Sequence, residues 1–159
     1  MVDSRAKGTR AEYEIRDKLR AHTDLGWERV PGSGGFSSNQ GLKGDVYLPP
    51  PTGKISAWTI EIKHYQEENF HSNLFKTTES QLEKWLAQTY REAGQMNAKP
   101  VLIFKKTRGV WLVAVDMEDA FDILDSDFTF MNFRKNDWDV IILNLDDWLS
   151  TKTTEDFIK

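Results

Sequence analysis

The spacing of hydrophobic residues predicts two amphipathic helices, at 8–22 and 79–96. In each segment apolar side chains recur every four residues between polar ones, which forms one apolar stripe along a helix. The stripe of the first helix consists of Ala11, Ile15 and Leu19, and that of the second of Leu82, Leu86 and Tyr90. Because such a stripe must be covered, we expect both helices to pack on a common core.

Short apolar runs between turn-forming residues predict the strands. They lie at 27–30, 45–48, 54–64, 100–106, 110–115 and 139–145. The sequence PPPTG at 49–53 predicts a turn that reverses the chain. We expect a short helix at 117–125, and loose attachment of the last dozen residues, which are mostly polar. This order predicts an α/β fold in a single domain, with a central mixed β-sheet flanked by helices on each face.

The charges are unevenly distributed along the 159 residues. Residues 1–115 hold 17 Lys and Arg against 13 Asp and Glu, a balance of +4, whereas residues 116–159 hold 4 against 12, a balance of −8. We therefore expect a core at 1–115 that can approach a polyanion, and an acidic C-terminal extension at 116–159 packed on the same domain.

Several classes of protein are excluded by composition. No run of about 18 apolar residues exists to span a membrane, and the N-terminus lacks the apolar region of a secretory signal. The chain has no Cys, which excludes disulfides and thiolate chemistry and fits a reducing cytoplasm.

The strand TIEIKH at 59–64 carries charges where a buried strand would be apolar. Glu61 and Lys63 point to one face, opposite Ile60 and Ile62. The turn before this strand brings Asp45 close to Glu61. Two neighbouring carboxylates need a cation between them, and hard oxygen ligands suit Mg²⁺ or Mn²⁺. Lys63 would then hold or deprotonate the attacking water, or neutralise charge that builds on a phosphoryl group.

Each of these features also has an ordinary structural interpretation. An E-x-K pair is commonly a solvated face or a local ion pair, although its combination with an Asp and a turn is more specific. Glu12 is either a surface residue paired with Arg16 or a third carboxylate that reaches the metal or a second metal. The loop RVPGSGG at 29–35 is either simply flexible or a phosphate-contacting loop.

Taken together, the motifs KG-x₃-E, R-V-P-x-S-G, G-D-V and I-E-I-K resemble the archaeal-type Holliday junction resolvases over roughly residues 7–105. These enzymes belong to the PD-(D/E)-x-K nuclease superfamily, and related resolvases occur in phages. The resemblance implies a nuclease core at 1–115 and a restriction-endonuclease-like fold. The implied catalytic residues are Glu12, Asp45, Glu61 and Lys63, of which Asp45, Glu61 and Glu12 would bind metal. The expected DNA-binding residues are Arg29, Ser33, Lys7, Arg10, Lys43 and Gln81.

Two positions depart from the family pattern. Tyr13 stands where the family usually has Arg, and Gly44 replaces the proline before the first Asp. The first change bears on contacts to the junction strands, whereas the second leaves the metal ligands in place.

The resemblance implies a structure-specific endonuclease, dependent on Mg²⁺ with Mn²⁺ as a substitute, that cuts four-way DNA junctions by paired symmetric nicks and leaves 5′-phosphates. A homodimer, no membrane partner, and a cytoplasmic location (that of the host for a viral protein) are expected. One alternative is a repair- or restriction-type nuclease that acts on flapped, mismatched or other branched DNA. Another is a non-catalytic DNA-binding protein, against which stands the retention of all four catalytic residue types.

Overall fold

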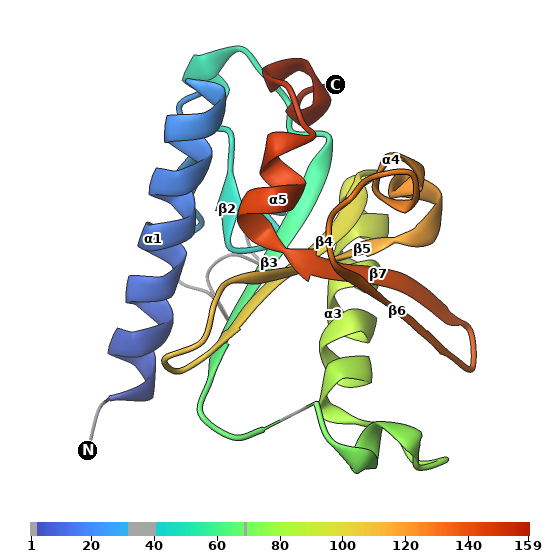
Figure 1. Cartoon of the computed structure of the whole chain (residues 1–159). Helices are drawn as coiled ribbons and strands as arrows, with labels where there is room; N and C mark the ends of the chain where they lie inside the picture. The colour runs from blue at the N-terminus through green and yellow to red at the C-terminus, as the bar shows by residue number, and fades with distance from the viewer. Residues whose placement is uncertain (1–2, 32–40, 69) are drawn as a thin grey trace.

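A mixed sheet of seven strands, in the order β1-β2-β3-β4-β5-β7-β6, runs through the computed structural model, which describes residues 3–31, 41–68 and 70–159 (Figure 1). The strands are β1 (Glu28–Arg29), β2 (Val46–Tyr47), β3 (Trp58–Tyr65), β4 (Lys99–Lys106), β5 (Leu112–Asp116), β6 (Phe130–Lys135) and β7 (Trp138–Asn144). The α-helices are α1 (Ser4–Thr23), α3 (Gln81–Met96), α4 (Phe121–Leu124) and α5 (Leu145–Ser150). Short 3₁₀ helices are η1 (Pro50–Thr52), η2 (Ser72–Phe75), η3 (Met117–Asp119) and η4 (Thr154–Phe157).

Strands β3 and β4 are parallel, whereas the other neighbouring strands of the sheet are antiparallel. A parallel pair needs a long crossover, and α3 supplies it. The helix begins with a capping box, in which Ser80 and Glu83 each accept a hydrogen bond from the backbone N–H of the other. The crossover therefore fixes α3 against the strand that carries the I-E-I-K motif.

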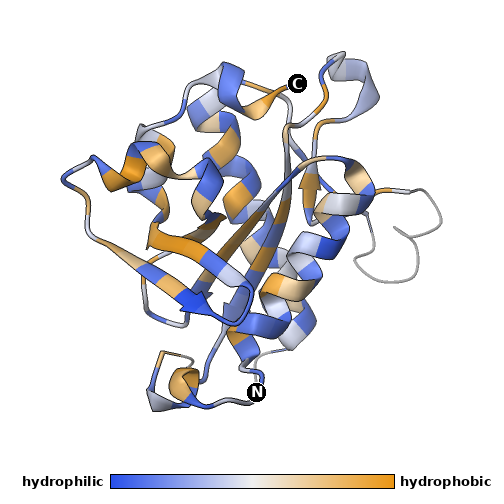
Figure 2. Ribbon diagram, turned by 90° about the vertical axis from the view of Figure 1, so that its right-hand side faces the viewer, coloured by the Kyte–Doolittle hydropathy of each residue, from blue (hydrophilic) through white to orange (hydrophobic). Residues whose placement is uncertain are grey.

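The sheet has a separate apolar layer on each face. On one face Ile60 and Ile62 of β3 pack with α1 and α5, and on the other Leu102 and Phe104 of β4 pack with α3. Figure 2 shows the hydrophobic residues gathered along the central strands. The α/β fold with helices on both faces is therefore confirmed, and so are the two apolar stripes, whose Ala11, Ile15, Leu19, Leu82 and Leu86 are buried.

The last residues of the chain are firmly docked, so the expectation of loose attachment is wrong. Phe157 is fully buried and packs edge-on against Trp27 and Trp148. The indole N–H of Trp58 donates to the carbonyl of Asp156 at 2.8 Å. The segment is mostly polar, and the sequence pattern therefore gave no sign that Phe157 packs in the core and docks it.

Residues 116–159 supply β6, β7 and α5 to the sheet and its helical layer. β7 pairs with β5 from Leu112–Asn144 to Asp116–Val140, and β6, which the sequence pattern did not predict, forms the outer strand. Within the described residues no helix is both long and apolar enough to cross a membrane.

Candidate active site

Strand β3 presents Glu61 and Lys63 to the face of the sheet that α3 covers. Their side chains form an ion pair, with 2.8 Å between Lys63 Nζ and Glu61 Oε1. The Glu61 side chain is 5% exposed and that of Lys63 is 25% exposed. Glu61 and Lys63 therefore lie on one face of the strand, as its alternation predicted. The Lys63 side chain is partly exposed to solvent.

Asp45 is held against β3 by two hydrogen bonds to the backbone of that strand. Its N–H donates to the Ile60 carbonyl at 2.8 Å, and its Oδ2 accepts from the Ile62 N–H at 2.7 Å. These contacts place the carboxylate beside Glu61, as the hairpin predicted.

Gly44 makes this close approach possible. Its φ is +81°, and a Cβ at this position would lie 2.8 Å from the Ile60 carbonyl oxygen. Proline, with φ fixed near −65°, does not fit this backbone. The departure from the family's proline therefore has a structural reason in this chain.

Side chains from α1, β3, α3 and the segment before β2 line one cavity of about 370 Å³. Its lining consists of Glu12, Leu42, Lys43, Gly44, Asp45, Glu61, Ile62, Lys63, Gln88 and Glu92. The structure thus brings the four predicted catalytic residues, Glu12, Asp45, Glu61 and Lys63, to one place.

Two polar side chains of the lining, Gln88 and Glu92, were not predicted as site residues. Gln88 Nε2 donates to Glu61 Oε1 at 2.9 Å and to Glu92 Oε1 at 3.2 Å, while its Oε1 accepts from Lys63 Nζ at 3.1 Å. Glu92 Oε2 accepts from the Gly44 N–H at 3.1 Å. Their spacing of four residues beside the apolar stripe of α3 was a signal, because it places both on one side of the helix.

Burial and neighbouring carboxylates raise the pKa of both central carboxyl groups. Burial raises the pKa of Asp45 well above its usual value, and the nearby Glu61 and Glu12 raise it further. Burial also raises the pKa of Glu61 to about 7, with Lys63 acting in the opposite direction and Glu92 adding to the rise. A bound cation would relieve this cost.

The donor set fits Mg²⁺ or Mn²⁺, since it offers buried carboxylate oxygens in a polar cavity open to further ligands. Within residues 3–31, 41–68 and 70–159, no group of three or more His, Asp or Glu side chains is arranged as a metal site on its own. Glu12 instead accepts a hydrogen bond from Arg29 Nε. Asp45 and Glu61 are therefore the principal candidate ligands, and Glu12 lies beside them in an ion pair.

The predicted DNA-binding residues are placed unequally. Lys43 lines the cavity, and Lys7 Nζ donates to the Thr107 hydroxyl at 2.6 Å. Arg10 is exposed on α1, and Ser33 lies outside the described residues. Gln81 is exposed at the start of α3 and does not line the cavity, where the glutamine present is Gln88.

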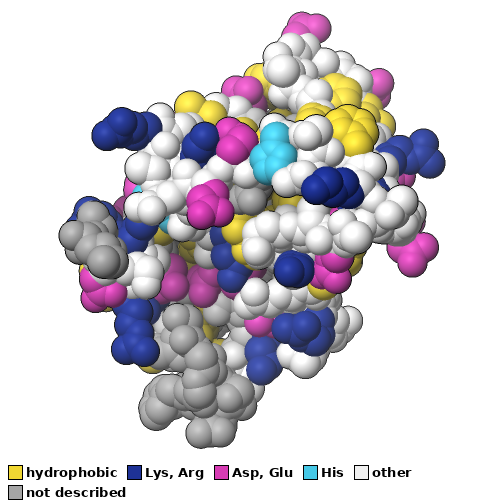
Figure 3. All heavy atoms as spheres, turned by 90° about the horizontal axis from the view of Figure 1, so that it is seen from below, with side chains coloured by type: hydrophobic (Ala, Val, Ile, Leu, Met, Phe, Trp, Pro, Cys, Tyr) yellow, Lys and Arg dark blue, Asp and Glu magenta, His cyan; other side chains and the backbone are white. Residues whose placement is uncertain are grey.

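Basic side chains gather at the end of β3, near His64. Partial burial lowers the pKa of His64, next to Lys63, and the nearby charges of Lys7 and Lys105 lower it further. Figure 3 shows Lys and Arg side chains spread over the face seen from below, interspersed with Asp and Glu side chains, some of which lie in a hollow. Basic groups at this end of β3 would attract a polyanion.

Three features together define a PD-(D/E)XK-type nuclease fold: a mixed sheet with helices on both faces, an acidic residue just before the first strand of a hairpin, and E-x-K on its second strand. Comparison with known families agrees: the family model described as phage putative PDDEXK endonuclease matches residues 3–159. The chain belongs to this family. It is also similar to Protein D14 of Escherichia phage T5, with 51% identity over 158 residues that cover 99% of each chain.

Proposed function

We propose that this protein is a metal-dependent DNA endonuclease that resolves four-way junctions by paired symmetric nicks. The observation that carries the proposal is the meeting of Asp45, Glu61 and Lys63 in one partly open cavity. Membership of a phage PD-(D/E)XK endonuclease family supports phosphodiester hydrolysis as the reaction. The resemblance to junction resolvases in the motifs around residues 7–63 supports the choice of substrate.

Asp45 and Glu61 would hold Mg²⁺, or Mn²⁺ in its place, with Glu12 close by. The bound ion would supply charge stabilisation at the scissile phosphate and lower the pKa of an attacking water. Lys63 is positioned by Glu61 and Gln88 so that its ammonium faces the same cavity. In our proposal it stabilises the charge that develops on the phosphate oxygens, and the products carry 5′-phosphates.

DNA would be held chiefly through its phosphates. Lys7, Arg10 and Lys105 gather near His64 at the end of β3, and Lys43 lies at the cavity itself. Arg29, paired with Glu12, is available to move to a phosphate once a cation occupies the acidic cluster. Binding of this kind depends on shape and salt rather than on base sequence.

A four-way junction has two symmetric scissile strands, so we propose a two-fold homodimer that presents two sites. The presence of a phage relative suggests the host cytoplasm as the place of action.

Tyr13 favours a second candidate, a repair- or restriction-type nuclease for other branched DNA. It is 43% exposed on α1, and the guanidinium groups of Arg16 and Arg29 lie over its ring at 4.7 and 5.7 Å. An aromatic ring therefore stands where the resolvases usually have a cation, which changes the contacts available to the junction strands.

The test is cleavage of a synthetic four-way junction beside linear duplex and a simple flap, with Mg²⁺, Mn²⁺ or EDTA. The wild type is expected to nick the junction in symmetric pairs, and Asp45→Asn and Glu61→Gln to lose about a hundredfold or more of the rate. Glu118→Gln, an exposed residue of η3, is the matched control. If flap or duplex were cut as fast as the junction, the second candidate would replace the resolvase. Tight junction binding without cleavage under any metal would overturn both candidates.

A further inference from the structure

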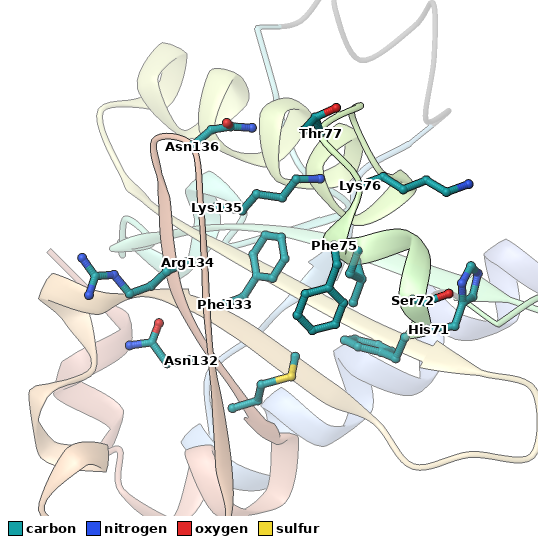
Figure 4. Close-up of a pocket in the computed structure, with 13 residues that line it drawn as sticks. His71, Ser72, Phe75, Lys76, Thr77, Asn132, Phe133, Arg134, Lys135 and Asn136 are labelled. Atoms are coloured by element: carbon teal, nitrogen blue, oxygen red, sulfur yellow. The ribbon is translucent and has the colours of Figure 1, made fainter.

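A second cavity lies at the other end of α3 and has a different character. This groove, of about 890 Å³, is formed between η2 and β6. Its walls are the side chains of Phe70, Phe75, Met131 and Phe133, and its rim carries Lys76 and Arg134. Figure 4 shows the rings of Phe75 and Phe133 directed into one space, with Lys76 and Arg134 extending to opposite sides.

Phe75 is the most conspicuous residue of this groove because it is 91% exposed. Phenylalanine is among the residues most often buried in folded proteins, and this ring is left open to a ligand. Phe133, on the facing strand, is 8% exposed and belongs to the apolar layer under α3. The groove thus joins a fixed apolar floor to one exposed ring.

The charges of the groove favour an anion. Its described lining includes three cationic side chains and no Asp or Glu. Lys135 is neutralised by the buried Glu83 at 2.8 Å, whereas the Arg134 side chain is 76% exposed and lies 3.8 Å from Asp139. Lys76 is exposed on the segment that follows η2. Aromatic faces between exposed cations are the arrangement by which proteins bind unpaired nucleotides, with bases stacked on rings and phosphates on the cations.

The groove is joined to the active site through one aromatic layer on the same face of the sheet. Tyr65, two residues beyond Lys63, stacks on Phe104 with 6.4 Å between ring centroids, and Phe70 stacks on Phe104 at 5.7 Å. Along α3, Glu83, which bonds to Lys135 of the groove, and Gln88 at the active site are five residues apart, a rise of about 7.5 Å. A strand with a few unpaired nucleotides is long enough to occupy both.

We propose that the groove between η2 and β6 binds unpaired nucleotides of the DNA substrate, with Phe75 as the stacking platform and Lys76 and Arg134 as phosphate contacts. The choice of DNA as ligand rests on the proposed nuclease function. A second copy of this chain fits the groove less well, because an isologous contact would place the same cations of both copies in one interface.

The test measures the affinity of a short fluorescein-labelled oligothymidylate by anisotropy, in EDTA so that cleavage plays no part. Phe75→Ala is expected to weaken binding by about 5- to 150-fold, the range for loss of one stacked base, and Phe75→Trp to retain it. The matched control is Phe121→Ala, which removes a ring that is 61% exposed on α4, outside the groove.

Lys76→Ala and Arg134→Ala should each reduce the slope of log affinity against log salt by about 0.7. Affinity for blunt duplex of the same length should not change with Phe75.

Photocrosslinking with an oligonucleotide that carries 5-iododeoxyuridine locates the contact without relying on a variant, and the crosslinked peptide is expected to contain Phe75. Equal oligonucleotide affinity for the wild type and Phe75→Ala would overturn the inference. So would a change of oligomeric state in Phe75→Ala with unchanged oligonucleotide affinity, since the groove would then join two copies. If the protein bound oligonucleotides through Phe75 but cut no DNA, this inference would stand and the proposed nuclease function would fail. If the protein cut substrates with unpaired nucleotides equally well with and without Phe75, the nuclease function would stand and this inference would fail.

Discussion

At the scale of single residues, the site depends on one glycine and one buried carboxyl group. Gly44 turns the chain so that Asp45 can bond to β3, and its N–H bonds to Glu92 of α3. Glu61 is close enough to Asp45 to raise the pKa of that carboxyl group, while Gln88 links Glu61 to Lys63. The motif residues alone do not keep this geometry, because Gly44, Gln88 and Glu92 hold them in place.

Restoring the family's proline should damage the site. Gly44→Pro replaces a residue at φ +81° and removes the N–H that bonds to Glu92. We expect a loss of about 2–4 kcal/mol in the free energy of unfolding by urea, together with reduced cleavage. Gly94→Ala, where a Cβ would meet nothing within 4 Å, should be as stable as the wild type or more so. A Gly44→Pro protein of unchanged stability would contradict the account of this turn.

The raised pKa of Glu61 predicts a pH dependence of stability in the absence of metal. Between the ordinary value of 4.5 and about 7, the folded protein holds a proton at Glu61 that the unfolded chain releases. Stability from this group is therefore present at low pH and is lost as pH rises through that window. In EDTA, the melting temperature of Glu61→Gln relative to that of the wild type should be higher at about pH 8 than at about pH 5. Glu118→Gln should show no such trend, and a constant difference between Glu61→Gln and wild type would refute the assignment.

At the scale of elements, the parallel pair β3 and β4 and its crossover helix α3 build the site. The strand supplies Glu61 and Lys63, and the helix returns Gln88 and Glu92 over the same face. The opposite face is covered by α1, α5 and η4, whose apolar side chains pack on the sheet. The C-terminal segment is thus a structural part of the layer behind the site.

Truncating the aromatic anchor of η4 should destabilise the whole protein. Phe157 is fully buried between Trp27 and Trp148. Phe157→Ala should cost about 3–5 kcal/mol, a fall in melting temperature of roughly 6–20 °C. Phe121→Ala, at an exposed position of α4, should stay within about 0.5 kcal/mol. Equal melting temperatures for the two variants would mean that η4 is not docked in solution.

At the scale of the whole molecule, an acidic recess opens on an end of the protein that carries basic side chains. Lys7 and Arg10 from α1 and Lys105 from β4 gather near His64, although the net charge of the chain is −4. The acidic excess is carried by residues 116–159, which form β6, β7 and the layer around α5. Charge distribution rather than net charge therefore sets the direction from which DNA would approach.

Binding of Mg²⁺ should stabilise the whole fold through the site. At about a hundred times its dissociation constant a ligand adds about 2.7 kcal/mol, which corresponds to a rise in melting temperature of roughly 5–10 °C for a chain of this size. The rise should grow as pH passes through about 7, where Glu61 loses its proton. Asp45→Asn should lose most of the effect, and addition of EDTA should reverse it in the wild type. An equal rise in melting temperature for the wild type and Asp45→Asn would mean that the ion binds outside this cavity.

The sequence by itself determined the features that depend on local patterns. The apolar stripes of α1 and α3 follow from helical periodicity, and the pairing of Glu61 with Lys63 follows from the alternation of a strand. The turn between β2 and β3 was enough to predict that Asp45 would meet Glu61. These residues are close along one hairpin, so little of the remaining fold is needed to bring them together.

Only the tertiary structure decided the contacts between distant segments. Gln88 and Glu92 are ordinary polar residues of a helix until the crossover turns them onto β3, and the glutamine that lines the cavity is Gln88 rather than the exposed Gln81. The docking of Phe157 depends on packing against Trp27 and Trp148, which no local pattern reports. The physical reason is the same in each case: periodicity says which face of an element is buried, whereas the partner across that face is fixed only when the elements pack.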